Sequence, residues 1–184
     1  SENGVVDLDY TLKKNITNLS DFKNKRPDEI TACLLNRPRH HKIINELNKM
    51  GVKLKLITDG DVAGALLVSQ EKNGIDIFLG IGGGPEGVLA ASALDTFNCF
   101  FQGKLIFDSE KDKDRAKQMG IKDFNKKYEL NEIVSGDSIF CATGITSGDL
   151  VEGIKINGDE FSSETLVTHK SSDFKKIIKL KQKI

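Results

Sequence analysis

A glycine-rich segment, "GIDIFLGIGGGPEGVLAASAL" at residues 74–94, has the residue types and spacing of a ligand-binding loop. Gly82, Gly84 and Gly87 match the G-x-G-x-x-G pattern of dinucleotide-binding loops, in which backbone N–H groups at a helix start hold a pyrophosphate. Glu86, however, lies inside the pattern, and a carboxylate in the first helical turn repels a pyrophosphate on the same amides. A divalent cation removes this objection, because Glu86 can hold a metal that bridges to phosphate oxygens. The segment thus favours a phosphate and metal site over a dinucleotide site.

A second candidate group is a pair of arginines around a proline in "NRPRH", directly after the apolar run "ITACLL". Pro38 keeps the segment extended, and side chains two positions apart on an extended segment lie on one side. The guanidinium groups of Arg37 and Arg39 can therefore converge on one anion, and their planar forks suit phosphate oxygens. A solvated pair of surface arginines is the alternative.

Two aspartates around a glycine follow the next predicted strand. Asp59, Gly60 and Asp61 can form a turn and cap the following helix, because aspartate is a favoured N-cap residue. In the functional alternative, one aspartate caps while the other accepts hydrogen bonds from sugar hydroxyls or joins a metal shell. A fourth polar group, mostly typical of a turn, follows a later strand: Thr143, Thr146 and Asp149.

These polar groups need secondary structure that brings them together. Apolar runs predict short strands, and apolar residues repeated every three to four positions predict helices between them. The expected strands are 30–35, 52–58, 75–81, 104–107 and 138–143, and the expected helices are 40–51, 61–74 and 85–97. This alternation favours a parallel or mostly parallel sheet covered on both faces. Because ligands bind beyond the carboxyl ends of such strands, we expect the polar groups at one edge of the sheet.

The last third of the chain has a different pattern. Asn157 and Gly158 predict a hairpin turn, and segments 165–169 and 174–181 are further strand candidates. The charged run at 109–117 predicts a helix with a solvated face. The predicted fold class is therefore α/β, with a mostly parallel sheet flanked by helices and an antiparallel C-terminal end.

Composition excludes several classes of protein. The 184 residues carry 27 Lys plus Arg and 27 Asp plus Glu, so the net charge is zero and gives no overall attraction to nucleic acid or membrane. No apolar run approaches the roughly 20 residues of a membrane span, and no signal peptide is visible. The odd number of cysteines, all flanked by apolar residues, predicts buried free thiols in a reducing compartment, here the cytoplasm: Cys33, Cys99 and Cys141.

Several segments together resemble the class II fructose-1,6-bisphosphatases. They cover most of residues 32–170 in the order of that family: "LNRPRHHKIINEL", "LITDGDVAGAL", "GIDIFLGIGGGPEGVLAASAL", "FNKKYELNEIVSGDSIFCATGITSGDL" and "SSETLVTH". Three positions depart from the family pattern: Asn36 replaces an aspartate, Gly84 an alanine and His169 an arginine. The resemblance implies the lithium-sensitive, metal-dependent phosphatase superfamily and half of its layered α/β/α/β/α fold.

The resemblance also implies a role for each matching position. Glu86 matches a ligand of the catalytic divalent metal, Mg²⁺ or Mn²⁺. The other matching positions belong to substrate-binding segments of the family: Arg37, Pro38 and Arg39 for the uncleaved C6 phosphate, Asp59, Gly60 and Asp61 for the sugar, and Gly83 for a backbone contact.

The implied reaction is hydrolysis of the C1 phosphate of fructose 1,6-bisphosphate to fructose 6-phosphate in gluconeogenesis, with sedoheptulose 1,7-bisphosphate as a further candidate substrate. The family's other metal-binding acids lie in an N-terminal portion that this chain does not match. We therefore expect residues 1–184 to form a single C-terminal sugar-phosphate-binding domain, inactive alone, of a homodimeric or homotetrameric enzyme. The alternative is a non-catalytic phosphosugar- or dinucleotide-binding module, for which Asp108 lies about where a ribose-binding acid falls.

Overall fold

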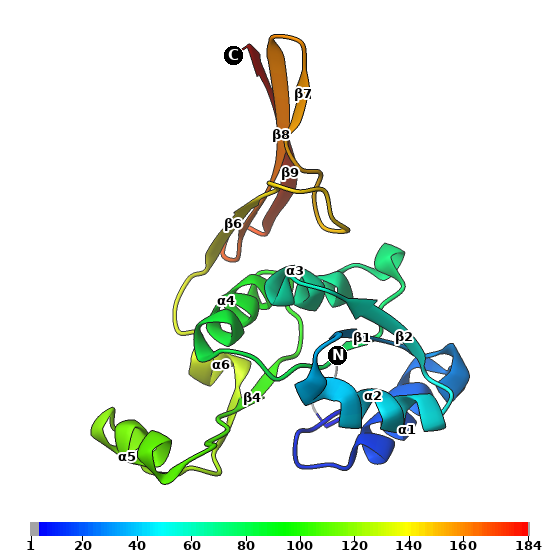
Figure 1. Cartoon of the computed structure of the whole chain (residues 1–184), viewed down its shortest axis with the longest axis vertical. Helices are drawn as coiled ribbons and strands as arrows, with labels where there is room; N and C mark the ends of the chain where they lie inside the picture. Colours follow the sequence, from blue (N-terminus) through cyan, green and yellow to red (C-terminus); the bar gives the residue numbers. More distant parts are fainter. Residues whose placement is uncertain (1–3, 184) are drawn as a thin grey trace.

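The computed structural model describes residues 4–183, in which helices and strands alternate through the first half (Figure 1). The helices are α1 (Leu12–Lys23), α2 (His41–Lys49), α3 (Asp61–Leu66), α4 (Gly84–Asp95), α5 (Glu110–Gln118) and α6 (Leu130–Ile133). Short 3₁₀ turns are η1 (Pro27–Glu29), η2 (Pro38–His40), η3 (Leu67–Ser69) and η4 (Glu71–Asn73). The strands are β1 (Thr31–Leu35), β2 (Lys53–Ile57), β3 (Ile77–Phe78), β4 (Gln102–Lys104), β5 (Lys127–Glu129), β6 (Ile139–Thr143), β7 (Lys155–Asn157), β8 (Glu160–His169) and β9 (Phe174–Lys183).

A three-stranded parallel sheet in the order β2-β1-β3 forms the centre of the first half. Its middle strand is buried on both faces, as expected for a parallel sheet between helices. Ala32 and Leu34 pack with α1 and α2 on one face, and Cys33 packs with Leu67 of η3 on the other. This arrangement confirms the predicted parallel sheet, although β3 is much shorter than the predicted strand 75–81.

The predicted helix 61–74 is shorter than expected and ends at Leu66. The Ser69 hydroxyl donates to the carbonyl of Leu66, and the Asn73 side-chain amide donates to the carbonyl of Leu67. Side chains thus take two carbonyls that a continuing α-helix would use, and the chain proceeds in the tighter turns η3 and η4.

The predicted strand 104–107 is wrong in position and in its pairing. Strand β4 ends at Lys104 and pairs antiparallel with β5 in a separate two-stranded sheet. The following apolar residues stay near the surface, with Leu105 41% and Ile106 62% exposed. A short apolar run was therefore mistaken for a buried strand.

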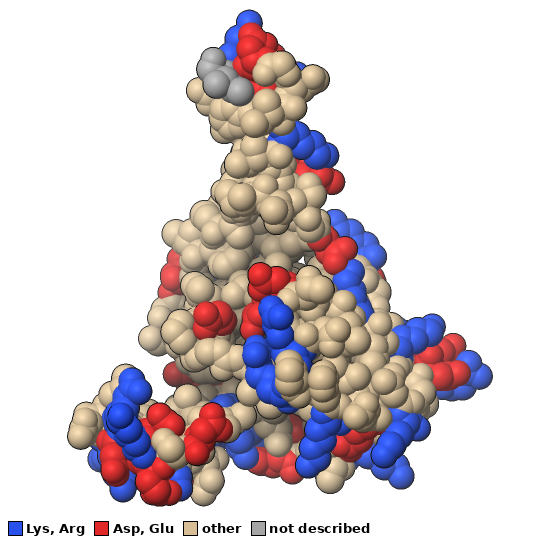
Figure 2. All heavy atoms as spheres, in the orientation of Figure 1, with Lys and Arg blue, Asp and Glu red and all other residues tan. Residues whose placement is uncertain are grey.

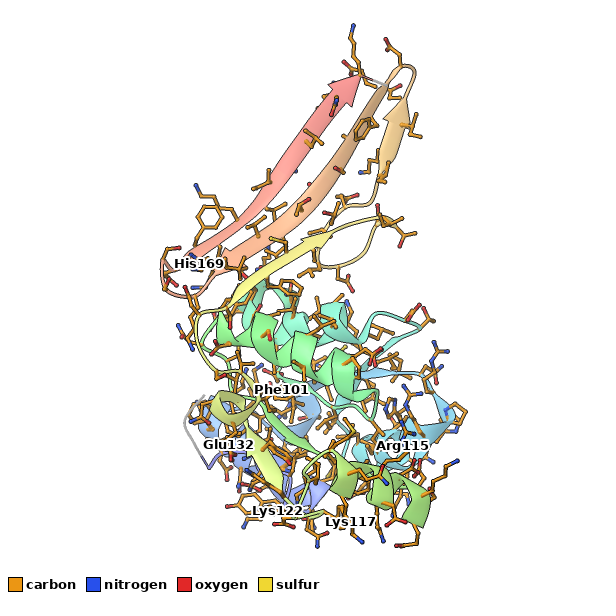
Figure 3. The ribbon with its side chains drawn as sticks, turned by 90° about the vertical axis from the view of Figure 1, so that its left-hand side faces the viewer. Phe101, Arg115, Lys117, Lys122, Glu132 and His169 are labelled. Carbon is orange, nitrogen blue, oxygen red and sulfur yellow. The ribbon has the colours of Figure 1, made fainter. Side chains whose placement is uncertain are left out.

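The C-terminal strands are antiparallel, as predicted, and form a sheet of their own. Strand β8 pairs with β9 along its whole length, with β6 at one end and with β7 at the other. The predicted hairpin from β7 to β8 is confirmed, with its turn one residue later than expected, at Gly158 and Asp159, because Asn157 still pairs with Glu160. Figure 3 shows this sheet over α3 and α4, with His169 at the turn between β8 and β9. The layers are therefore α1 and α2, the parallel sheet, α3 and α4, and the antiparallel sheet, which confirms the α/β class.

The two faces of the antiparallel sheet differ in polarity. Leu166 of β8 is buried against Ala90, Ala93 and Leu94 of α4 on the inner face. The register places large apolar side chains on the opposite face, with polar ones such as Ser163, Thr165 and Lys176 between them: Ile139, Cys141, Val167, Phe161, Ile156, Ile178 and Leu180. We call this set the outer face. In Figure 1 the β7 end of the sheet extends beyond α3 and α4.

The outer face corrects two predictions about burial. The strand predicted at 138–143 is not buried, because Ile139 is 68% exposed. The three cysteines are free, but only Cys33 is buried, whereas Cys99 is half-buried and Cys141 is exposed.

Lys, Arg, Asp and Glu side chains mix over α5, which confirms the predicted solvated helix (Figure 2). None of the helices between residues 4 and 183 is long and apolar enough to cross a membrane.

Candidate functional site

The carboxyl ends of β1, β2 and β3 meet at one edge of the parallel sheet, as the βαβ connections require. A hollow of about 390 Å³ lies there, within the range of small-ligand pockets. Six of the eight predicted site residues line it, together with Val62 and Ala63: Arg39, Asp59, Gly60, Asp61, Gly83 and Glu86. The structure thus brings together one guanidinium group, three carboxylates and the glycine loop.

The arginine segment is not extended as predicted, and only one arginine reaches the hollow. Residues Pro38–His40 form η2, with Pro38 in its first turn, where a missing N–H costs nothing. A 3₁₀ turn has three residues per turn, so side chains two apart point in different directions. Arg39 lines the hollow, and its Nε–H donates to the carbonyl oxygen of Ile81. Arg37 and Pro38 do not line it.

The aspartate segment makes a tight turn into α3. Gly60 is the N-cap residue in the left-handed conformation, with φ 85°, which explains a glycine at this position. The Asp59 carboxylate accepts a hydrogen bond of 2.8 Å from the N–H of Gly60. Neither aspartate caps α3 through its side chain, so the capping interpretation is wrong. Asp61 lies half-buried in the first helical turn, where the helix dipole favours a carboxylate.

Two carboxylates lie over adjacent glycines of the loop that opens α4. A Cβ atom on Gly83, the N-cap residue, would be 2.2 Å from Oε2 of Glu86, and a Cβ atom on Gly82 would be 2.9 Å from Oδ2 of Asp61. The glycines therefore leave the space that the two carboxylates occupy. Among the described residues, no group of three or more His, Cys, Asp or Glu side chains could hold a metal ion. Since Mg²⁺ is held by carboxylates together with phosphate oxygens and water, these carboxylates can supply part of such a site.

The dinucleotide interpretation has no support in the loop geometry. In dinucleotide-binding loops the last glycine of the pattern permits close packing of helix on strand. Here a Cβ atom on Gly84 or Gly87 would meet nothing within 4 Å. Asp108 follows β4, which belongs to the separate antiparallel pair and not to the parallel sheet.

The polar group after β6 and the buried thiol lie outside the hollow. Thr143 pairs with Thr165 across the antiparallel sheet, with 2.9 Å between their hydroxyl oxygens, and Asp149 forms an ion pair with Lys55. Burial raises the pKa of the Cys33 thiol to about 11, so this cysteine is not a thiolate nucleophile near neutral pH. Neither group therefore contributes to the hollow.

One residue beside the site was missed by the sequence interpretation. His40 is fully buried, and its ring nitrogens contact the backbone of Leu35 at the end of β1 and of Ile81 in the glycine loop. The only sequence signal was its position directly after Arg39. A histidine among polar neighbours gives no indication that it folds inward.

Comparison with known proteins places this geometry in context. A family model described as "Bacterial fructose-1,6-bisphosphatase, glpX-encoded" matches residues 1–182. The chain is 36% identical over 182 residues to the "D-fructose 1,6-bisphosphatase class 2/sedoheptulose 1,7-bisphosphatase" of Synechococcus sp. (strain JA-3-3Ab), covering 92% of the chain and 52% of the relative. It is 34% identical over 182 residues to the protein of the same name from Synechocystis sp. (strain ATCC 27184 / PCC 6803 / Kazusa), covering 92% of the chain and 53% of that relative. The chain therefore spans about half the length of the curated relatives it matches.

Proposed function

Because the chain belongs to the family of bacterial, glpX-encoded fructose-1,6-bisphosphatases, we propose that it supplies the sugar-phosphate-binding part and one metal ligand of such an enzyme. The proposed reaction is hydrolysis of the C1 phosphate of fructose 1,6-bisphosphate to fructose 6-phosphate and phosphate, as a step of gluconeogenesis in the cytoplasm. The observation that carries this proposal is the hollow that Arg39 lines together with Asp59, Asp61 and Glu86 and with Gly83 of the glycine loop. Sedoheptulose 1,7-bisphosphate is a second substrate candidate, since the relatives' names include it.

In this proposal, Arg39 binds the phosphate that is not cleaved. Its Nε–H is already held by the carbonyl of Ile81, so the Nη groups remain to donate to phosphate oxygens. Binding at this distal phosphate positions the sugar, and such remote binding energy lowers the barrier of the chemical step. Asp59 and Asp61 line the same hollow and can accept hydrogen bonds from sugar hydroxyls.

Glu86 is the proposed metal ligand of this chain. When bound, a Mg²⁺ or Mn²⁺ ion would polarise the C1 phosphoryl oxygens and lower the pKa of an attacking water. Glu86 presents its carboxylate beside Gly83 at the start of α4, and Asp61 leans over the neighbouring Gly82. Because no larger ligand cluster is found among residues 4–183, we propose that the remaining protein ligands come from the half of the family's length that this chain does not match.

The same unmatched half is proposed to cover the antiparallel sheet. On the outer face, Ile139 and Ile156 are 68% and 69% exposed, and Ile178 and Leu180 are nearly half exposed. A sheet face that carries several exposed large apolar side chains is normally covered by another layer. We therefore propose that residues 1–184 are one sugar-phosphate-binding domain of a larger phosphatase, with the metal-binding domain on the outer face. Assembly of the larger enzyme into a homodimer or homotetramer belongs to the same proposal.

Calorimetry on the 184-residue chain tests the binding part of the proposal. Fructose 1,6-bisphosphate and NAD are each titrated with and without Mn²⁺, using wild type, Arg39→Ala and the control Arg37→Ala. We expect the wild-type chain to bind the sugar bisphosphate weakly, and more tightly when Mn²⁺ is present. Arg39→Ala should abolish this binding, whereas Arg37→Ala should largely keep it. Binding of NAD in preference to the sugar bisphosphate, independent of Mn²⁺, would instead support the non-catalytic module.

A chimera tests the catalytic part. In the chimera, residues 1–184 replace the half of the Synechococcus sp. (strain JA-3-3Ab) relative that they match. The other half keeps the sequence of that relative. We expect release of inorganic phosphate from fructose 1,6-bisphosphate by the chimera and none by the 184-residue chain alone.

A further inference from the structure

We propose that His40 is a positioning residue that fixes the glycine loop relative to Arg39, and thereby sets the distance between the phosphate-binding guanidinium group and Glu86. The proposal deepens the function proposed above and rests on it for its catalytic consequence. It is carried by the contacts of one fully buried side chain.

The two ring nitrogens of His40 bind two different segments. The N–H of Ile81 donates to Nε2 at 2.8 Å, and Nδ1 lies 2.8 Å from the carbonyl oxygen of Leu35. Because a backbone N–H can only donate, Nε2 must carry the lone pair, so the ring proton is on Nδ1 and is donated to Leu35. The neighbouring contact of 3.2 Å between Nε2 and the Ile81 carbonyl oxygen therefore joins two acceptors and is no hydrogen bond.

His40 and Arg39 together hold both polar groups of Ile81. The N–H of Ile81 is bound by His40, and its carbonyl oxygen accepts from Nε of Arg39. These groups belong to successive peptide planes, so two planes of the loop are fixed by adjacent residues of η2. Leu35, the last residue of β1, connects the same ring to the parallel sheet.

We call the contacts of His40 and Arg39 with Ile81 the clamp. The loop depends on the clamp because its own residues offer few side chains that could fix it. Ile81 is followed by three glycines, Gly82–Gly84, which have no side chains to pack and a wide range of backbone conformations. The clamp lies two residues before Gly83 and five before Glu86. A shift of the loop would therefore move the proposed metal ligand with it, and a displacement of about 1 Å in an active site costs about a hundredfold in rate.

Two substitutions separate the two hydrogen bonds. In His40→Gln, the longer side chain can place Oε1 near the position of Nε2 and accept from Ile81, whereas the bond to Leu35 is lost. In His40→Asn, the amide can donate to Leu35 but does not reach Ile81. Both variants remove the same ring and leave one backbone group unpaired, so they are matched for loss of stability. Thermal unfolding of both measures that loss directly.

The decisive measurement is hydrogen exchange at the Ile81 amide in the 184-residue chain without any ligand. We expect exchange at least about tenfold faster in His40→Asn than in wild type, and near wild type in His40→Gln, at equal global stability. Two results would overturn the proposal. One is equal protection of the Ile81 amide in wild type and His40→Asn. The other is an equal loss of protection in both variants that follows their loss of Tm.

Kinetics of the chimera then separate this proposal from the proposed function. We expect His40→Asn to lower kcat/KM by about tenfold to a hundredfold and His40→Gln to restore most of it. Equal kcat/KM in His40→Asn and wild type, despite faster exchange at Ile81, would overturn the positioning role. A failure of the proposed function has another signature: Arg39→Ala and Glu86→Gln leave phosphate release unchanged, while exchange at Ile81 still responds to His40.

Discussion

Adding one methyl group at Gly83 tests whether the position of the Glu86 carboxylate matters. In Gly83→Ala the new Cβ atom lies 2.2 Å from Oε2 of Glu86, so the carboxylate must move by about 1 Å to reach an ordinary contact of 3.4 Å or more. The backbone itself is not strained, because Gly83 has φ −70° and ψ 148°, which alanine adopts readily. The change therefore displaces the proposed metal ligand without disturbing the fold.

The expected effect of Gly83→Ala is on turnover, not on stability. A displacement of about 1 Å at a reacting centre costs about a hundredfold in rate, so kcat of the chimera should fall by about that factor at saturating substrate. The Tm of the 184-residue chain should stay close to wild type. The assay is phosphate release at fixed Mn²⁺, combined with thermal unfolding by circular dichroism.

Gly84→Ala is the matched control one residue along the same loop. Apart from its chain neighbours, a Cβ atom on Gly84 meets nothing within 4 Å and does not touch Glu86, so the variant should keep its activity. If Gly83→Ala kept full activity, or if both variants lost activity equally, the Glu86 carboxylate would not be the group that the loop positions.

Two further predictions concern Arg39 and a buried carboxylate. Arg39→Ala in the chimera should mainly raise KM, whereas Arg37→Ala, outside the hollow, should change KM little. Steady-state kinetics measure this, and equal changes of KM in the two variants would refute the assignment of Arg39. Asp76 has a 4% exposed side chain; burial raises its pKa, but hydrogen bonds from Lys23, Lys25 and the Thr31 N–H outweigh burial and hold the pKa below its ordinary value. This group therefore contributes stability above the unfolded pKa of 3.8, which is lost as pH falls through the lower folded pKa. In urea unfolding, Asp76→Asn should lower the free energy of unfolding by about 2 kcal/mol at neutral pH and reduce the loss of stability below about pH 4. The control Asp28→Asn should do neither. If the stability of Asp76→Asn fell below pH 4 as steeply as that of wild type, this role would be contradicted.

The parallel half of the fold could be predicted because local patterns and burial agree there. Strand β1 lies in the short apolar run 30–35 and is buried on both faces, and α2 was predicted from its regular apolar spacing. Helix α1, which covers the same face as α2, was not predicted because its apolar periodicity is weak. The antiparallel half was harder to predict. Ile139 and Cys141 belong to an equally apolar run, yet they lie exposed on the outer face, because sequence hydrophobicity does not say which layer covers a sheet.

The candidate site was predictable where the chemistry depends on residue type and strand order. Glu86 was identified because a carboxylate in a glycine loop conflicts with a pyrophosphate, and Asp61 because it follows the neighbouring strand. The geometry of η2 was not predictable in the same way. Pro38 suits an extended segment and the first turn of a helix equally, so the direction of Arg39 and the inward position of His40 depend on tertiary contacts with Ile81.

The Mn²⁺ dependence of phosphate release by the chimera tests the central claim most directly, with wild type compared with Glu86→Gln. Glutamine keeps the size of the side chain but removes the charge that would bind the cation. We predict that Glu86→Gln lowers kcat strongly and that the Mn²⁺ concentration for half-maximal activity rises, while KM for fructose 1,6-bisphosphate changes little. Full activity of Glu86→Gln at limiting Mn²⁺ would contradict the assignment of Glu86 as the metal ligand of this chain.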